Sequence, residues 1–180
     1  WLQGLNTTLG QTFFENVSHI LSDGEKREYT SKKLGNLPID KKQKENVNSI
    51  ITNLSTAKTI PNLNNENQKL FINDATESIS AIDFSADVFI DDGTQITAIE
   101  LKSVRPNSGE MRGEKQKILE GKAALYKNFS GKPIRFLMGF PFDPTNENSA
   151  TGYNKARFLS SIINMNKYFA SDEVLLASEL

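Results

Sequence analysis

The sequence predicts an α/β fold in which a mixed β-sheet is covered by helices on both faces. Amphipathic helical patterns occur near the N-terminus, strand-forming segments flank a tight turn in the middle, and the second half alternates helix, strand and helix. This order of elements is typical of a layered sheet and helix arrangement. The 180 residues, 37% hydrophobic and 24% charged, predict a single domain spanning residues 1–180.

Two amphipathic helices are expected in the N-terminal third. Apolar residues recur at helical spacing over 6–21, where Ser22-Asp23-Gly24 ends the pattern, and a second helix is expected over 40–55. The apolar positions are Leu9, Phe13, Val17, Ile20 and Leu21 in the first and Val47, Ile50, Ile51 and Leu54 in the second. The polar stretch PNLNNENQK from Pro61 predicts a surface loop or a helix cap.

A β-hairpin is expected at the centre of the chain. The segments ADVFI (86–90) and QITAIELKSV (95–104) are rich in β-branched and aromatic residues, and they flank the turn sequence DDGT. If Asp92-Gly93 forms a two-residue turn, Asp91 faces Thr94, and Asp87 lies opposite Ala98 and diagonal to Glu100. The hairpin register therefore depends on the turn.

The C-terminal half predicts a loop over 106–114, a helix over 115–129, a buried strand over 133–142 and a last amphipathic helix over 153–169. The phenylalanine-rich segments around Phe13 and Phe136 are interpreted as core. The chain has no cysteine, which excludes disulfides, thiolate zinc sites and a cysteine nucleophile. No apolar run of membrane-spanning length and no leader pattern occurs, so we expect a soluble, cytoplasmic protein. The start at Trp1 rather than Met is compatible with a piece of a longer chain.

Charge is distributed unevenly, although the net charge is only −1. Residues 61–100 are strongly acidic and residues 101–135 strongly basic, which predicts a cation-attracting segment followed by a phosphate-attracting one. The acidic residues are Glu66, Asp74, Glu77, Asp83, Asp87, Asp91, Asp92 and Glu100, against Lys69. The alternative is that these charged runs are solvated helix faces with no role in binding.

Three charged residues of the hairpin form the candidate catalytic group. Because side chains alternate along a strand, Asp87, Glu100 and Lys102 project from one face. The opposite face carries Val88, Ile90, Ile99 and Leu101, which would anchor the hairpin. Two neighbouring carboxylates commonly hold a divalent cation, and hard oxygen ligands favour Mg²⁺. A nearby lysine can orient a water and neutralise charge on a phosphate. A salt-bridged group on an exposed sheet face remains the alternative.

The run ADVFI-DDGTQIT-AIELKSVRPN resembles the PD-(D/E)XK nuclease signature, with Ala86 where that signature has proline. The segments WLQGLNTTLGQTFFENVSHILSDGEKREYT, KSVRPNSGEMRGEKQK and RFLMGFPFDP resemble type II restriction endonucleases of the Tde type, which cut GGNCC-like sites. The resemblance implies a restriction-endonuclease-like fold, Mg²⁺ dependence, double-stranded DNA as substrate and a homodimer. It also implies that Glu15 and Gln116 join the catalytic residues, with an ordinary solvated helix residue as the alternative for Glu15. His19 is interpreted as an ordinary structural histidine.

On this basis Asp87, Glu100 and the Leu101 carbonyl are expected to bind Mg²⁺, with Lys102 acting on the attacking water. The basic side chains expected to contact DNA are Arg105, Arg112, Lys115, Lys117, Lys155 and Arg157. Two alternatives stay open: a repair or junction-resolving nuclease of the same superfamily, and a DNA-binding module of the same fold without activity.

Overall fold

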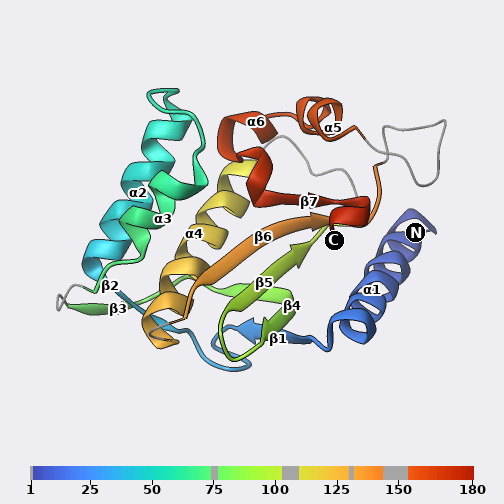
Figure 1. Cartoon of the computed structure of the whole chain (residues 1–180), viewed down its shortest axis with the longest axis horizontal. Helices are drawn as coiled ribbons and strands as arrows, with labels where there is room; N and C mark the ends of the chain where they lie inside the picture. The colour runs from blue at the N-terminus through green and yellow to red at the C-terminus, as the bar shows by residue number, and fades with distance from the viewer. Residues whose placement is uncertain (1, 74–76, 103–109, 130–131, 144–153) are drawn as a thin grey trace.

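The computed structural model describes residues 2–73, 77–102, 110–129, 132–143 and 154–180. Its centre is a five-stranded sheet in the order β1-β4-β5-β6-β7 (Figure 1). The strands are β1 (Glu25–Tyr29), β4 (Phe84–Asp91), β5 (Ile96–Leu101), β6 (Ile134–Phe140) and β7 (Val174–Leu176). Strands β1, β4 and β5 pair antiparallel, whereas β5, β6 and β7 pair parallel. The predicted mixed sheet is therefore confirmed.

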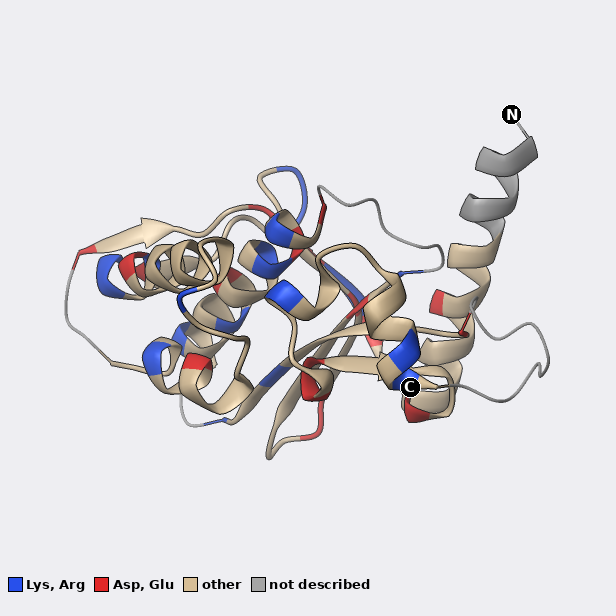
Figure 2. Ribbon diagram, turned by 90° about the horizontal axis from the view of Figure 1, so that it is seen from above, with Lys and Arg blue, Asp and Glu red and all other residues tan. Residues whose placement is uncertain are grey.

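The helices cover both faces of this sheet. The main core joins one face to α2 (Lys41–Ser55), α4 (Glu110–Asn128) and α6 (Met165–Tyr168), and it contains Ala98 and Phe136 of the sheet. Helix α3 (Leu63–Leu70) packs beside α2, and α5 (Lys155–Ser161) precedes α6. Helix α1 (Leu2–Ser22) contacts β4 and β5 and stands on the side of the molecule away from α2 and α3, as both views show (Figure 1 and Figure 2).

Helix α1 packs loosely against its sheet face. The predicted apolar positions Val88, Ile99 and Leu101 form a small cluster there, with Ile90 against it. A cavity of about 350 Å³, lined by apolar side chains of α1, the sheet and the C-terminus, remains between helix and sheet. Phe13 is 60% exposed, so its assignment to the core was wrong, whereas Phe136 is buried as predicted.

Strand β4 contains a β-bulge at the position of Asp87. Glu25 pairs with Phe89 and Arg27 with Ala86, so three steps along β4 match two along β1. As a result Ala86 and Phe89 both face the main core, although they are three residues apart. Bulges interrupt the alternation of side chains and can direct one of them to a new side.

The predicted hairpin register needs a correction. Asp91 pairs with Ile96 and Phe89 with Ala98, so the register differs by two residues from the one expected for a two-residue turn. The loop is longer because Asp92 accepts hydrogen bonds from the backbone of Thr94 and Gln95, at 2.8 and 2.7 Å. Because the strand period is two, a shift of two leaves the side chains between the bulge and the turn on their predicted faces, with Val88 and Ile90 opposite Phe89.

Other differences concern short elements. The segment after Pro61, predicted as a loop or a helix cap, supplies the N-cap Asn62, which accepts from the Asn65 N–H, and then forms α3. Helix α4 begins at Glu110, and the expected helix 153–169 is two helices separated at Ile162–Asn164, where Asn164 has φ 64°. Four strands were not predicted: β1, β7 and the two-stranded sheet β2 (Pro38–Asp40) and β3 (Ser78–Ser80). No helix in the described ranges is long and apolar enough to span a membrane.

Candidate active site

Asp87 lies in the bulge of β4, with only 3% of its surface exposed. Its Oδ2 accepts the backbone N–H of Leu101 at 2.9 Å, which ties the carboxylate to the end of β5. Its backbone carbonyl lies 2.6 Å from Nε2 of His19, on α1. His19 therefore has the structural contact expected of it, and that contact holds α1 against the site.

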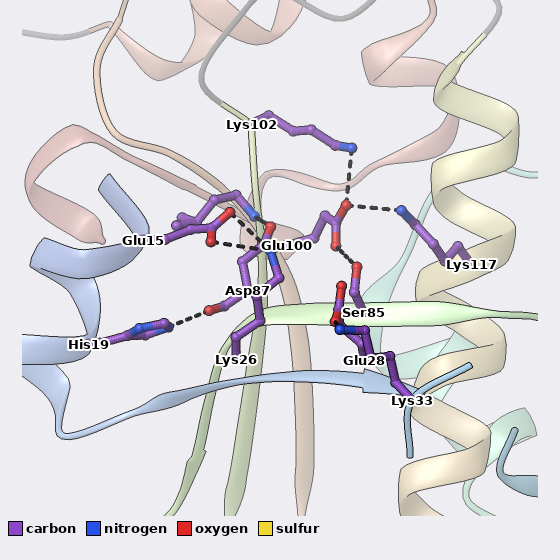
Figure 3. A network of polar contacts seen from close by, with 11 residues as sticks. Glu15, His19, Lys26, Glu28, Lys33, Ser85, Asp87, Glu100, Lys102 and Lys117 are labelled. Carbon is purple, nitrogen blue, oxygen red and sulfur yellow. Dashed lines mark hydrogen bonds and ion pairs between the residues drawn. The ribbon is translucent and has the colours of Figure 1, made fainter. Parts of the chain in front are cut away.

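Glu100, 6% exposed, faces α4 from β5. Its Oε1 accepts from Lys102 Nζ at 3.2 Å and from Lys117 Nζ at 2.9 Å (Figure 3). Its Oε2 accepts from the Ser85 hydroxyl of β4 at 3.2 Å. Both oxygens are thus held by donors, and the side chain has a defined orientation.

Glu114 of α4 connects the two lysines that contact Glu100. It accepts from Lys102 Nζ at 2.9 Å and pairs with Lys117 Nζ at 3.0 Å. Burial opposes ionisation of Glu114, but its contacts with Lys102 and Lys117 outweigh burial and lower the pKa of its carboxyl. Burial likewise opposes the charged form of Lys117, but Glu100 and Glu114 outweigh it and raise the pKa of the ammonium.

Glu15 reaches the site through a lysine of β1. Lys26 Nζ lies 3.1 Å from Glu15 Oε2 and 3.0 Å from Asp87 Oδ1, and Figure 3 shows it between the two carboxylates. Burial lowers the pKa of Lys26, but its contacts with Asp87 and Glu15 outweigh burial and raise it. Glu15 is therefore joined to Asp87 by a cation and not by a direct hydrogen bond.

The charges of this group nearly balance. Its carboxylates are Glu15, Asp87, Glu100 and Glu114, and its ammonium groups are those of Lys26, Lys102 and Lys117. Four negative charges against three positive ones leave the group at −1. A buried group with a residual negative charge attracts cations.

The donor set fits Mg²⁺. Asp87 and Glu100 supply two buried carboxylates beside the Leu101 peptide, and Mg²⁺ is usually bound through one or two carboxylates, waters and substrate phosphates. Within the part of the chain that the structure describes, no group of three or more His, Cys, Asp or Glu side chains is arranged to hold a metal.

The other predicted residues lie in different places. Gln116 donates to Glu120 Oε1 at 3.2 Å, a carboxylate outside the candidate catalytic group, so the structure does not bring it to the site. Lys115 is fully buried between Glu66 and Glu173, and a buried ammonium cannot contact a duplex in this conformation. The structure overturns its assignment to DNA contact, because the pattern could not show which face of α4 is internal.

Lys117, predicted to contact DNA, pairs with Glu100 in the candidate catalytic group. Arg112 is exposed on α4. Lys155 pairs with Glu179 at 2.7 Å, and the exposed Arg157 pairs with Asp143 at 3.3 Å, both at the start of α5. Arg105 lies outside the described residues.

Three residues of the group were not anticipated: Lys26, Ser85 and Glu114. Lys26 belongs to the charged five-residue strand EKREY, which has no clear apolar alternation. Glu114 was expected in a loop, although its spacing of three from Lys117 would have marked a helical pair had α4 been extended to Glu110.

Comparisons with known proteins give evidence on the family of the chain. A relative named type II restriction enzyme MjaII, from Methanocaldococcus jannaschii, is 45% identical over 185 aligned residues. The alignment covers 100% of this chain but 48% of that protein, so the chain spans about half the length of this relative. No solved structure matches the chain at a significant level.

The resemblance to the Tde type and to GGNCC-cutting enzymes is not confirmed by these comparisons and stays a prediction. A family model described as "Type II restriction endonuclease, HinfI" matches residues 1–180 of this chain. The chain therefore belongs to the HinfI family of type II restriction endonucleases.

Proposed function

We propose that this chain carries the nuclease activity of a type II restriction endonuclease, hydrolysing phosphodiester bonds of double-stranded DNA at a specific sequence. The observation that carries the proposal is the gathering of Asp87, Glu100 and Lys102 at the end of the β4–β5 hairpin, in a chain of this family. The relative MjaII is named as an enzyme of this type.

Asp87, Glu100 and the Leu101 carbonyl are the proposed Mg²⁺ ligands. The Leu101 N–H points at Asp87, and the N–H and C=O of one strand residue point toward the same neighbouring strand. The Leu101 carbonyl therefore faces the side of β5 on which Asp87 lies. Bound there, Mg²⁺ would supply Lewis-acid polarisation of the scissile phosphate.

Among the chain's own side chains, Lys102 is the one proposed to act directly on the attacking water and the phosphate. Its ammonium, held by Glu100 and Glu114, orients the attacking water and stabilises the charge that develops on the phosphate. The water oxygen bonds to phosphorus as the bond to the 3′ oxygen breaks, and a proton passes to that oxygen. The products are a 5′-phosphate and a 3′-hydroxyl.

Glu15 is proposed to act through Lys26, as a positioning residue. Arg112, Lys155 and Arg157 are proposed phosphate or base contacts, together with Arg105, and Lys117 contributes positive charge beside Glu100. Gln116 is no longer proposed as a catalytic residue; its role is to donate a hydrogen bond to Glu120. We further propose a homodimer acting in the cytoplasm, because one active site per chain cuts two antiparallel strands most simply as a two-fold dimer.

Digestion of a plasmid of known sequence with Mg²⁺ tests the proposal. A restriction enzyme yields a fixed set of fragments, whereas a repair or junction-resolving nuclease leaves a plain duplex intact or cuts it without fixed positions. Asp87→Ala and Glu100→Ala should abolish cutting while DNA affinity, measured with Ca²⁺, is retained. Cutting by either variant near the wild-type rate would place the active site elsewhere.

A further inference from the structure

Lys26 is the charged residue of the active-site region that the proposed mechanism leaves without a direct task. Its Nζ lies 3.0 Å from Asp87 Oδ1, 3.1 Å from Glu15 Oε2 and 3.2 Å from Glu15 Oε1. The side chain is 36% exposed, against 4% for Asp87 and 15% for Glu15. Lys26 thus reaches inward from the surface to two largely buried carboxylates.

The backbone directs Lys26 to this place. Its neighbours Glu25 and Arg27 pair with Phe89 and Ala86. Lys26 therefore lies opposite the β4 bulge, which contains Asp87. On its other side, the contact between His19 and the Asp87 carbonyl holds α1, and with it Glu15, one helical turn away. Two independent elements therefore present their carboxylates to one ammonium group.

Three oxygens within hydrogen-bond distance form a cation position distinct from the one between Asp87 and Glu100. Glu100 accepts hydrogen bonds from Lys102, Lys117 and Ser85, whereas Lys26 contacts Asp87 and Glu15. Asp87 belongs to both positions: its Oδ1 faces Lys26 (Figure 3), and its Oδ2 accepts the Leu101 N–H. Hydrolytic sites with two metal ions share a bridging carboxylate in a comparable way and use the second ion to stabilise the leaving oxygen.

We propose that the Lys26 ammonium fills this second cation position, so that each active site takes up one divalent ion, at Asp87 and Glu100, and not two. This inference rests on the proposed function and deepens it. An ammonium at contact distance repels a dication and occupies the oxygens that the dication would need. At the first position, by contrast, Asp87 Oδ2 and Glu100 Oε2 accept from neutral donors, the Leu101 N–H and the Ser85 hydroxyl. It also supplies beside the phosphate a positive charge that requires no metal.

Mn²⁺ binding, followed by electron paramagnetic resonance of the free ion, tests the proposal without relying on cleavage. Mn²⁺ accepts the same carboxylate and carbonyl oxygens as Mg²⁺. The wild-type chain should bind one ion, Lys26→Met should bind two, and the double variant Glu15→Gln, Lys26→Met should return to one. Lys33→Met is the matched control, because Lys33 pairs with Glu28 at 3.6 Å at the surface and should leave the number at one.

The outcomes separate this inference from the proposed function. Two ions bound by the wild-type chain, or one by a folded Lys26→Met variant, would overturn the role of Lys26 while leaving the nuclease proposal standing. No Mn²⁺ bound by the wild-type chain would count against the metal site itself. If Lys26→Met does not fold, Glu15→Gln alone decides: it should still bind one ion with unchanged affinity, and loss of that ion would make Glu15 a metal ligand and refute the proposal.

Discussion

Lys102 illustrates at the residue scale how one ammonium can be held ready for a phosphate. It lies just beyond the last residue of β5, its N–H donates to the Gly139 carbonyl at 2.8 Å, and its side chain ends between Glu100 and Glu114. The backbone bond and the two carboxylates fix both ends of the side chain. Such restraint lowers the cost of orienting the charge during reaction.

Lys102→Ala should reduce turnover by roughly 10²–10³-fold, the usual loss when one positioned donor is removed from a charge-stabilising site. Single-turnover cleavage at saturating Mg²⁺ measures it. Lys33→Ala, which removes an exposed lysine paired with Glu28 of β1, is the control and should cut at the wild-type rate. Unchanged turnover for Lys102→Ala would remove Lys102 from the mechanism.

Glu114 predicts a pH effect on stability. Its folded-state pKa lies below the ordinary value of 4.5, so its ion pairs with Lys102 and Lys117 stabilise the fold above that value and are lost as the pH falls through the folded-state pKa. The free energy of unfolding should therefore fall less between neutral and acidic pH in Glu114→Gln than in the wild type. Urea denaturation at about pH 7 and about pH 3.5 measures the difference. An equal fall in both proteins would contradict the assignment.

At the scale of elements, α4 determines much of the site because it carries Glu114 and Lys117 toward β5 and buries its opposite side. Lys115 and Lys122 point away from the site into a cluster with Glu66 and Glu173. Burial opposes ionisation of Glu173, but Lys115 and Lys122 outweigh it and lower the pKa of that carboxyl. The helix is therefore fixed by ion pairs on one side while it serves the catalytic group on the other.

Glu173→Gln should lower the free energy of unfolding by about 3–5 kcal/mol, because two buried ammonium groups lose their shared partner. Glu45→Gln removes the exposed partner of Lys42 and should change stability by less than about 1 kcal/mol. Chemical denaturation of the two variants compares them directly. Equal effects would mean that the buried cluster contributes nothing beyond a surface pair.

The two glycines of α4 give a second test of how the helix packs. A Cβ on Gly121 would lie 2.5 Å from Phe136 Cε1, whereas one on Gly113 meets nothing within 4 Å. Gly113→Ala should stabilise the protein by about 0.5–1 kcal/mol, since alanine favours the helix. Gly121→Ala should destabilise it by about 1–3 kcal/mol through overpacking against β6. Thermal unfolding of both variants would refute this packing if they shift the midpoint in the same direction.

At the scale of the whole molecule, the proposed assembly follows from the substrate. The described residues of each chain hold one proposed catalytic group, at the end of one hairpin, and a duplex has two antiparallel strands to cut. A two-fold dimer on a palindromic sequence places one group at each strand. Light scattering of the protein bound to cognate DNA in Ca²⁺ should give two chains per duplex, and one chain per duplex would rule this assembly out.

The sequence by itself determined the layered α/β fold, the main helices, the hairpin and the grouping of Asp87, Glu100 and Lys102. These features depend on local periodicity, and the two-residue error in register left the side chains between the bulge and the turn on their predicted faces because the strand period is two. Short elements escaped prediction: three-residue strands such as β7 contain too few residues to show a pattern.

Only the tertiary structure decided which cations surround the carboxylates. Lys26 and Asp87 are brought together by the pairing of β1 with β4 across a bulge, and neither strand alone indicates that contact. Likewise, the docking of α4 decided that Lys117 faces Glu100 while Lys115 is buried. Long-range strand pairing and helix packing fix these positions, and no local sequence pattern records them.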